Sequence, residues 1–371
     1  MFPKYKMHLK TSARLIGGLS LSISAVYTPL AIAQSSVTLY GILDDGITYV
    51  NNMGGHSVVQ QSSGVFSASR FGFKGSEDLG GGMRAIFTLE DGFTLNNGAF
   101  GQGTANVTRV FGRQAYVGLA SPYGTVTLGR QYDYMFDLGF YSSAAYVTSL
   151  SLRPGSGTLL NGNNGGTPDF DRVAGARVDN SVKYSSANYR GMTFGAMYGF
   201  GGQPGTLANG STKSFGVRYA STAFGIGMAF TDYTEPDGSS HLRNWGAGTS
   251  YKFSHALLTA TYTNTRYSQT GDSVDVADVG GLYNFTASFH AGIAYVFMRP
   301  NNGTNNIILR GTRSQYVASV GYSLSKRTDI YAAVGYQRSH AGDGAQIYNF
   351  APTDLSADGQ LIAHVGLRTL F

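Results

Sequence analysis

The sequence lacks cysteine, has few prolines and contains no long hydrophobic run. Without cysteine, no disulfide can stabilise an exported chain, so its fold must be held by backbone hydrogen bonds and packing. No stretch of eighteen consecutive apolar residues occurs, which excludes membrane-spanning helices. Nine prolines in 371 residues leave long β-ladders intact, because each proline removes a backbone donor.

The N-terminus has the features of an export signal. Its basic residues are Lys4, Lys6, Lys10 and Arg14. A mostly apolar run at 15–26 follows, and Ala31 and Ala33 then supply small residues at the spacing that signal peptidase prefers. We expect a cleaved signal peptide at 1–33 and one mature domain at 34–371, the alternative being a disordered basic terminus. Removing four of 27 basic and none of 21 acidic residues lowers the net charge from +6 to +2, so charge gives no reason to expect a nucleic-acid partner.

The other end of the chain indicates a membrane strand. Residues 361–371 alternate with period two and end on Phe371. Soluble domains usually end in frayed polar residues, whereas a strand that ends on an aromatic residue suits a membrane boundary. The segment therefore favours a transmembrane β-barrel.

Alternation of this kind recurs along the whole chain, with 52 glycines, 25 tyrosines and 22 phenylalanines. Residues 289–297 place Phe289, Ile293 and Tyr295 on one face and glycine, alanine and histidine on the other. The same pattern is found at 83–90, 215–219, 226–230, 316–322 and 330–336. A soluble β-sandwich also alternates, but small residues and scattered charge on the second face suit a wet lumen better.

Connections of two lengths are expected to alternate between the strands. Seven short ones are expected at 75–82, 121–124, 185–191, 220–225, 253–256, 284–287 and 323–329. Eight long polar ones are expected at 51–64, 92–107, 131–172, 201–212, 232–243, 264–276, 299–313 and 338–358. Together they predict an all-β fold, a sixteen-stranded antiparallel transmembrane β-barrel wide enough to hold an aqueous channel.

Several motifs carry a resemblance to a known family. They are SSVTLYGILDDG, SRFGFKGSEDLGGGMRAIF, FGRQAYVGL, GTVTLGRQYD, RVDNSVKYSS and HVGLRTLF. In this order they resemble the β-proteobacterial branch of the general porins. The resemblance implies a homotrimer in the outer membrane of a Gram-negative bacterium that passes small hydrophilic solutes and ions. It also implies contact with outer-membrane lipid and lipopolysaccharide, and Phe371 as a C-terminal signal for the barrel-assembly machinery.

The residues from 131 to 170 show no clear strand period. A loop of this length is usually functional or disordered. In the general porins the third extracellular loop folds into the barrel and narrows the lumen, and this segment sits in the matching place. It carries Asp133, Asp137 and Asp169, together with Arg153. The alternative is a plain surface loop.

A basic wall is expected to face that loop. Arg70 lies five residues before a turn expected at Gly75, which at about 3.3 Å per residue is roughly 16 Å up its strand. Arg113 and Arg177 each lie eight residues before an expected turn, and Lys183 lies nearer the periplasmic exit. A charge that faces lipid at mid-membrane depth costs about 2–4 kcal/mol, so these side chains should face water. The alternative is that these charged side chains only keep the lumen hydrated and have no role in ion selectivity.

Opposed basic and acidic rows would orient dipolar solutes, and three or four basic groups against about three acids predict weak anion selectivity. Arg70 and Arg113 match arginines of the wall cluster in the general porins. Asp179 stands where enteric relatives carry another arginine, which leaves the role of Arg177 open. Arg130 shares a strand face with apolar residues, and the sequence pattern gives it no role.

The sequence predicts no enzyme, cofactor or metal site. A catalytic site needs a nucleophile, a base and an orienting group together, whereas the histidines here are isolated in loops or single on strands. Asp272, Asp275 and Asp278 resemble no calcium-binding loop. The remaining alternative to a channel is a barrel that acts as an adhesin or surface receptor and has no open pore.

Overall fold

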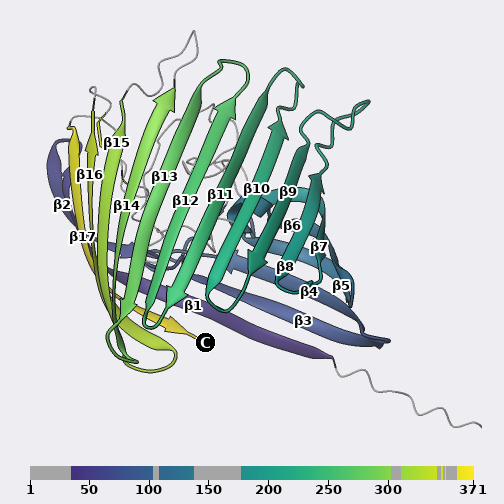
Figure 1. Cartoon of the computed structure of the whole chain (residues 1–371), viewed down its shortest axis with the longest axis horizontal. Coiled ribbons are helices and arrows are strands. Elements are labelled where there is room, and N and C mark those ends of the chain that lie inside the picture. Colours follow the sequence, from purple (N-terminus) through teal and green to yellow (C-terminus); the bar gives the residue numbers. More distant parts are fainter. Residues whose placement is uncertain are drawn as a thin grey trace, which may run out of the picture. The chain divides into compact units, whose positions relative to one another are not determined.

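The computed structural model describes residues 35–102, 108–137, 177–301, 311–340, 344–345, 347 and 357–371. Within them the chain forms seventeen strands of one antiparallel sheet (Figure 1). The strands are β1 Ser36–Met53, β2 His56–Ser63, β3 Arg70–Gly80, β4 Met83–Gly92, β5 Gln114–Ser121, β6 Gly124–Tyr132, β7 Arg177–Ser186, β8 Met192–Gly199, β9 Thr212–Ala220, β10 Phe224–Thr234, β11 His241–Phe253, β12 Ala256–Tyr267, β13 Ser273–Asn284, β14 Phe289–Asn301, β15 Arg313–Ser323, β16 Thr328–Ser339 and β17 Gly359–Leu370. The described helical residues make one turn at 134–137, and no described helix is long and apolar enough to cross a membrane.

The sheet closes on itself. β1 pairs with β17 along 42–50, and each later strand pairs with its neighbours in sequence. β2 and β3 both pair with β1, in its second and first halves respectively. They are two parts of one wall strand that residues 64–69 interrupt. The barrel therefore has sixteen wall strands, which confirms the predicted sixteen-stranded antiparallel barrel.

The outer and inner faces of the barrel differ as a membrane requires. Ile293 on β14 and Val365 on β17 point outward and are 69% and 65% exposed. The opposite face of β12 carries hydroxyl groups at every second position, from Thr259 to Thr265. Apolar side chains on the outside and polar ones on the inside are the arrangement of a barrel in lipid, and not of a soluble sandwich.

Several expected connections differ in the structure: 232–243 and 264–276 lie partly in strands, and 51–64 and 75–82 differ most. Residues 51–64 are mostly strand, with a tight reversal at Gly54 and Gly55, whose φ angles are 65° and 83°. The turn expected at Gly75 instead falls at 80–82, where three glycines have positive φ. Gly75 lies within β3 because the ring of Phe87 occupies the space that a Cβ would fill. Glycine at this position thus permits close packing across strands and does not reverse the chain.

The interruption at 64–69 folds against the inner wall. Asp44 of β1 accepts hydrogen bonds from the backbone N–H of Ser67 and from the hydroxyl of Tyr331, the latter at 2.5 Å. The ring of Phe66 lies 5.1 Å from that of Tyr331 and 4.5 Å from the guanidinium of Arg368. These contacts fix the segment that leads directly into β3.

Candidate channel constriction

A buried ion pair lies at the loop end of β4. Arg113 Nε donates to Glu90 Oε1 at 2.7 Å, and the hydroxyl of Tyr40 donates to Glu90 Oε2 at 2.9 Å. Both charged residues are almost fully buried. Tyr40 and Glu90 occupy inner positions of β1 and β4, so the pair lies on the lumenal side. Removing one partner of such a pair would leave an uncompensated buried charge.

Tyr132, the last residue of β6, brings three cations together. Its hydroxyl accepts hydrogen bonds from Nη2 of Arg113 and Nη2 of Arg177, each at 2.8 Å. The Arg177 guanidinium also lies 4.7 Å from the centre of the Tyr132 ring. The Tyr132 carbonyl accepts from Lys183 Nζ at 2.9 Å. One aromatic residue thus links basic side chains from β7 and from the residue that precedes β5.

Arg70 joins this group from β3. It is close enough to Arg113, Glu90 and Tyr40 to interact with them electrostatically. Its Nε donates to the carbonyl of Ala68 at 3.1 Å, so the inward segment orients the side chain. Its terminal nitrogens form no hydrogen bond with a residue in the described part of the chain. Arg70, Arg113, Arg177 and Lys183 are called the basic cluster below.

Asp133 anchors the start of the third loop. Its Oδ2 accepts from the hydroxyl of Thr231 and its Oδ1 from the backbone N–H of Phe136, both at 2.8 Å. Burial raises the pKa of Asp133 to about 6; the two hydrogen bonds oppose this rise and the neighbouring Asp137 carboxylate adds to it. The carboxylate points toward β10, and it lies close enough to Lys183 to interact with it electrostatically.

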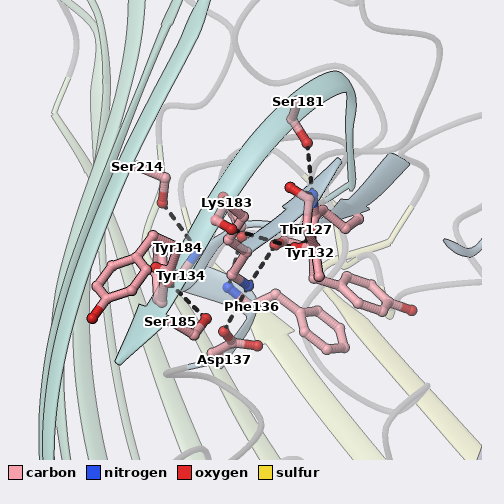
Figure 2. A network of polar contacts seen from close by, with 12 residues as sticks. Thr127, Tyr132, Tyr134, Phe136, Asp137, Ser181, Lys183, Tyr184, Ser185 and Ser214 are labelled. Carbon is pink, nitrogen blue, oxygen red and sulfur yellow. Dashed lines mark hydrogen bonds and ion pairs between the residues drawn. The ribbon is translucent and has the colours of Figure 1, made fainter. Parts of the chain in front are cut away.

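Tyr134 holds the same loop to the inner wall. Its backbone N–H donates to Ser214 Oγ at 3.0 Å, and its hydroxyl donates to the carbonyl of Tyr184 at 2.5 Å (Figure 2). The side chain fills the space above Gly195 and Gly216, where an added Cβ would lie closer than 3 Å to it. Glycines on β8 and β9 therefore provide the recess into which the loop fits.

Asp137 makes an ion pair with one member of the basic cluster. Lys183 Nζ lies 3.0 Å from Asp137 Oδ2 and 4.4 Å from the centre of the Tyr134 ring (Figure 2). Asp169 and Arg153 lie outside the described residues, as do positions 138–176 of the third loop. The structure thus describes six of the seven predicted constriction residues, and all six lie around Tyr132 and the start of the third loop.

Sequence reasoning missed Tyr40, Glu90 and Tyr132. The alternation of 83–90 already put Glu90 on the face opposite the apolar residues, but nothing local showed that Arg113 would pair with it. Arg70 also lies farther from its turn than expected, because β3 continues to Gly80.

Arg130 and Asp179 form a further charged group, and Arg130 lies close enough to Arg177 to interact with it electrostatically. Arg130 shares the outward face of β6 with the exposed Leu128 and forms an ion pair with Asp179. Asp179 also lies 2.8 Å from Arg109. A bulge at Asn180, whose φ is 53°, accompanies the register shift there. Asp179 therefore pairs with Arg109 and Arg130 and does not neutralise Arg177.

Comparisons with known proteins agree with this architecture. A family model described as Gram-negative porin matches residues 20–342. An outer membrane porin protein of Bordetella pertussis is 28% identical, with 87% of this chain and 94% of the relative covered. Outer membrane porin protein 32 of Delftia acidovorans is also 28% identical, with 92% and 95% covered. Among solved structures, the anion-selective porin from Comamonas acidovorans aligns with a TM-score of 0.74 at 22% identity, covering 91% of this chain and all of that one.

Proposed function

The chain belongs to the Gram-negative porin family and forms an outer-membrane channel, and we propose that this channel is a trimeric, weakly anion-selective diffusion pore for small hydrophilic solutes. The observation that carries the selectivity is the convergence of Arg70, Arg113 and Arg177 around Tyr132 on the lumenal side. The named Comamonas relative is described as anion-selective, which agrees with this proposal.

The net charge at the channel constriction sets the ion selectivity. The basic cluster supplies four positive charges, and Glu90, Asp133 and Asp137 supply three negative ones. These seven residues therefore carry a net charge of +1. Two of the four cations are each paired with an acid, Arg113 with Glu90 and Lys183 with Asp137. A small positive excess attracts anions without closing the path to cations.

The wall strands differ in length around the barrel, which supports a trimer. β5, β6, β8 and β9 have eight or nine residues, whereas β11 to β14 have twelve or thirteen. A shorter wall suits a subunit contact, because it need not span the full bilayer by itself. Stepwise insertion of conductances in threes is the expected sign of this assembly.

Planar-bilayer recording in a salt gradient tests the proposal. We expect a large ohmic conductance and a reversal potential on the anion side. Arg70→Ala and Arg113→Ala should move that potential toward cation selectivity, while Lys326→Ala at the opposite end of the barrel should leave it unchanged. Unmoved potentials in both arginine variants would refute the filter. A barrel that inserts without conducting would instead favour the adhesin or receptor alternative.

Two further parts of the proposal concern export and assembly. We propose that residues 1–33 are removed, which N-terminal sequencing of the outer-membrane form should show as a new start at Gln34. Phe371 is proposed as the signal for the assembly machinery, and the outer wall as the surface in contact with lipopolysaccharide. Deletion of Phe371 should lower the yield of assembled barrel in cells more than in detergent refolding.

A further inference from the structure

In the part of the wall formed by β9 to β17, the lipid-facing side carries charged residues at only one of its two ends. Along β9 to β17, the outward cations within the strands are Lys213, Arg243, Arg266, Arg299 and Arg338, and the outward acids are Asp232 and Asp275. All seven lie at the loop ends. The outward positions at the turn ends of the same strands carry no charge and are mostly aromatic or aliphatic, for example Tyr251, Phe253, Tyr283 and Tyr322.

The two ends therefore face chemically different surroundings. An aromatic girdle without charge fits an interface of ordinary phospholipids. An excess of cations directly above the apolar band fits an anionic headgroup layer, because each basic side chain near such a layer is attracted to it. In a barrel of this family the loop end is the extracellular end, so the cations stand at the outer leaflet.

The centre of this charged band contains two arginines side by side. Arg243 of β11 and Arg266 of β12 are direct cross-strand partners, and both are exposed. Like charges in this position repel each other and destabilise a sheet unless an anion lies between them. Arg266 forms no hydrogen bond or ion pair with any described residue. Arg243 has only Asp232, whose Oδ1 lies 3.6 Å from its Nε.

The nearby Asp232 is not sufficient to neutralise the cations around it. Asp232 is the cross-strand partner of both Lys213 and Arg243, and it also contacts His241 at 3.1 Å. Asp232 is thus the one acid in a group with Lys213, Arg243 and Arg266, and the four residues carry a net charge of +2. The neighbouring Arg299 differs, because Asp275 already accepts from its Nη2 at 3.0 Å. The unsatisfied charge is therefore concentrated on β9 to β12.

We propose that Lys213, Arg243 and Arg266 form a binding site for the phosphate groups of lipopolysaccharide in the outer leaflet. Paired guanidinium groups bind phosphate oxygens through short, charge-assisted hydrogen bonds. The aromatic side chains of Phe230 and Trp245, one outward position below, would lie against the first part of the acyl chains. The proposal depends on the outer-membrane location and not on the ion selectivity of the pore.

Binding of bisphosphorylated lipid A to the purified, folded full-length barrel in detergent tests the site. The variant is Arg243→Gln with Arg266→Gln, and the matched control is Lys326→Gln with Arg327→Gln, which removes the same charge from an exposed turn at the opposite end. We expect the first pair to weaken binding by about tenfold or more, because two charge-assisted contacts are lost. The control pair should bind like the wild type.

A third variant tests the opposite direction. Asp232→Asn removes the one acid of the group and should tighten binding severalfold, which a barrel that had lost its fold would not do. Lipid A without its phosphates should bind weakly to every form. Single-channel conductance should be the same in all variants, so a failure here is distinguishable from a failure of the pore proposal. Equal affinity of the wild type and the double arginine variant, or equal binding of phosphatidylglycerol and lipid A, would overturn the assignment.

Discussion

Phe371 and Gly41 close the barrel at its seam. The backbone N–H of each donates to the carbonyl oxygen of the other, at 3.2 Å from Phe371 and 3.1 Å from Gly41. The ring of Phe371 lies over Gly41, where an added Cβ would be closer than 3 Å to the ring. The last residue of the chain thus completes the ladder that begins in β1.

Gly41→Ala should weaken this seam. The new methyl group would collide with the Phe371 ring and with the backbone oxygen of Arg70, and overpacking of this kind costs about 1–3 kcal/mol. The temperature at which the folded barrel unfolds on semi-native electrophoresis should fall. Gly281→Ala is the control, because its new methyl group would lie 3.1 Å from the flexible end of Leu258 and at an ordinary contact distance of 3.6 Å from the Leu257 carbonyl. An equal loss in both variants would contradict a specific role for the seam.

Glu90→Gln should increase anion selectivity. The substitution removes a negative charge beside Arg113 and raises the net charge of the described constriction residues from +1 to +2, while an amide can still accept the hydrogen bond. The reversal potential in a salt gradient should shift further to the anion side. Asp237→Asn changes the net charge equally in an exposed loop and should have no effect. Stability should also fall, since breaking a buried ion pair costs about 3–5 kcal/mol.

Gly216→Val should release the start of the third loop. A larger side chain at this position occupies the recess that holds the Tyr134 ring. We expect a changed single-channel conductance and more frequent closures, because the loop start would lose its seat on β8 and β9. Tyr134→Ala, which empties the recess without a collision, should reproduce the conductance change. A normal recording from both variants would show that the contact does not shape the pore.

The anchoring of Asp133 should depend on pH. Its pKa is raised from an ordinary value of 3.8 to about 6 in the folded protein, so the folded state binds the extra proton between these two values. The contribution of Asp133 to the free energy of unfolding is therefore greatest below about pH 4. It falls by on the order of 3 kcal/mol as the pH rises through 6. Thermal unfolding from pH 3.5 to 7 should show this slope in the wild type.

Asp133→Asn is the matching variant. The amide keeps an acceptor for the Thr231 hydroxyl and has no proton to lose, so the slope between pH 4 and 6 should shrink. A slope that is the same in the variant would mean that another group causes the pH dependence.

Much of the wall was predictable from the sequence, whereas the site was predictable only in part. The alternation in 289–297 and 361–371 is a local property of the chain, and it identified strands that the structure contains. The basic residues Arg70, Arg113 and Arg177 were found because charge at membrane depth must face water. Their partners were not found, because Glu90 is 23 residues from Arg113 and Tyr132 is 45 residues from Arg177.

The sequence alone determined the compartment, the barrel and its sixteen wall strands, because side-chain alternation and turn chemistry act over a few neighbouring residues. Only the tertiary structure decided that Gly75 makes room for Phe87, that 64–69 folds inward to orient Arg70, and that a bulge turns Asp179 outward to Arg130. Each of these depends on the register between strands. Register is fixed by cross-strand packing and hydrogen bonding among residues far apart in the chain, which no local pattern records.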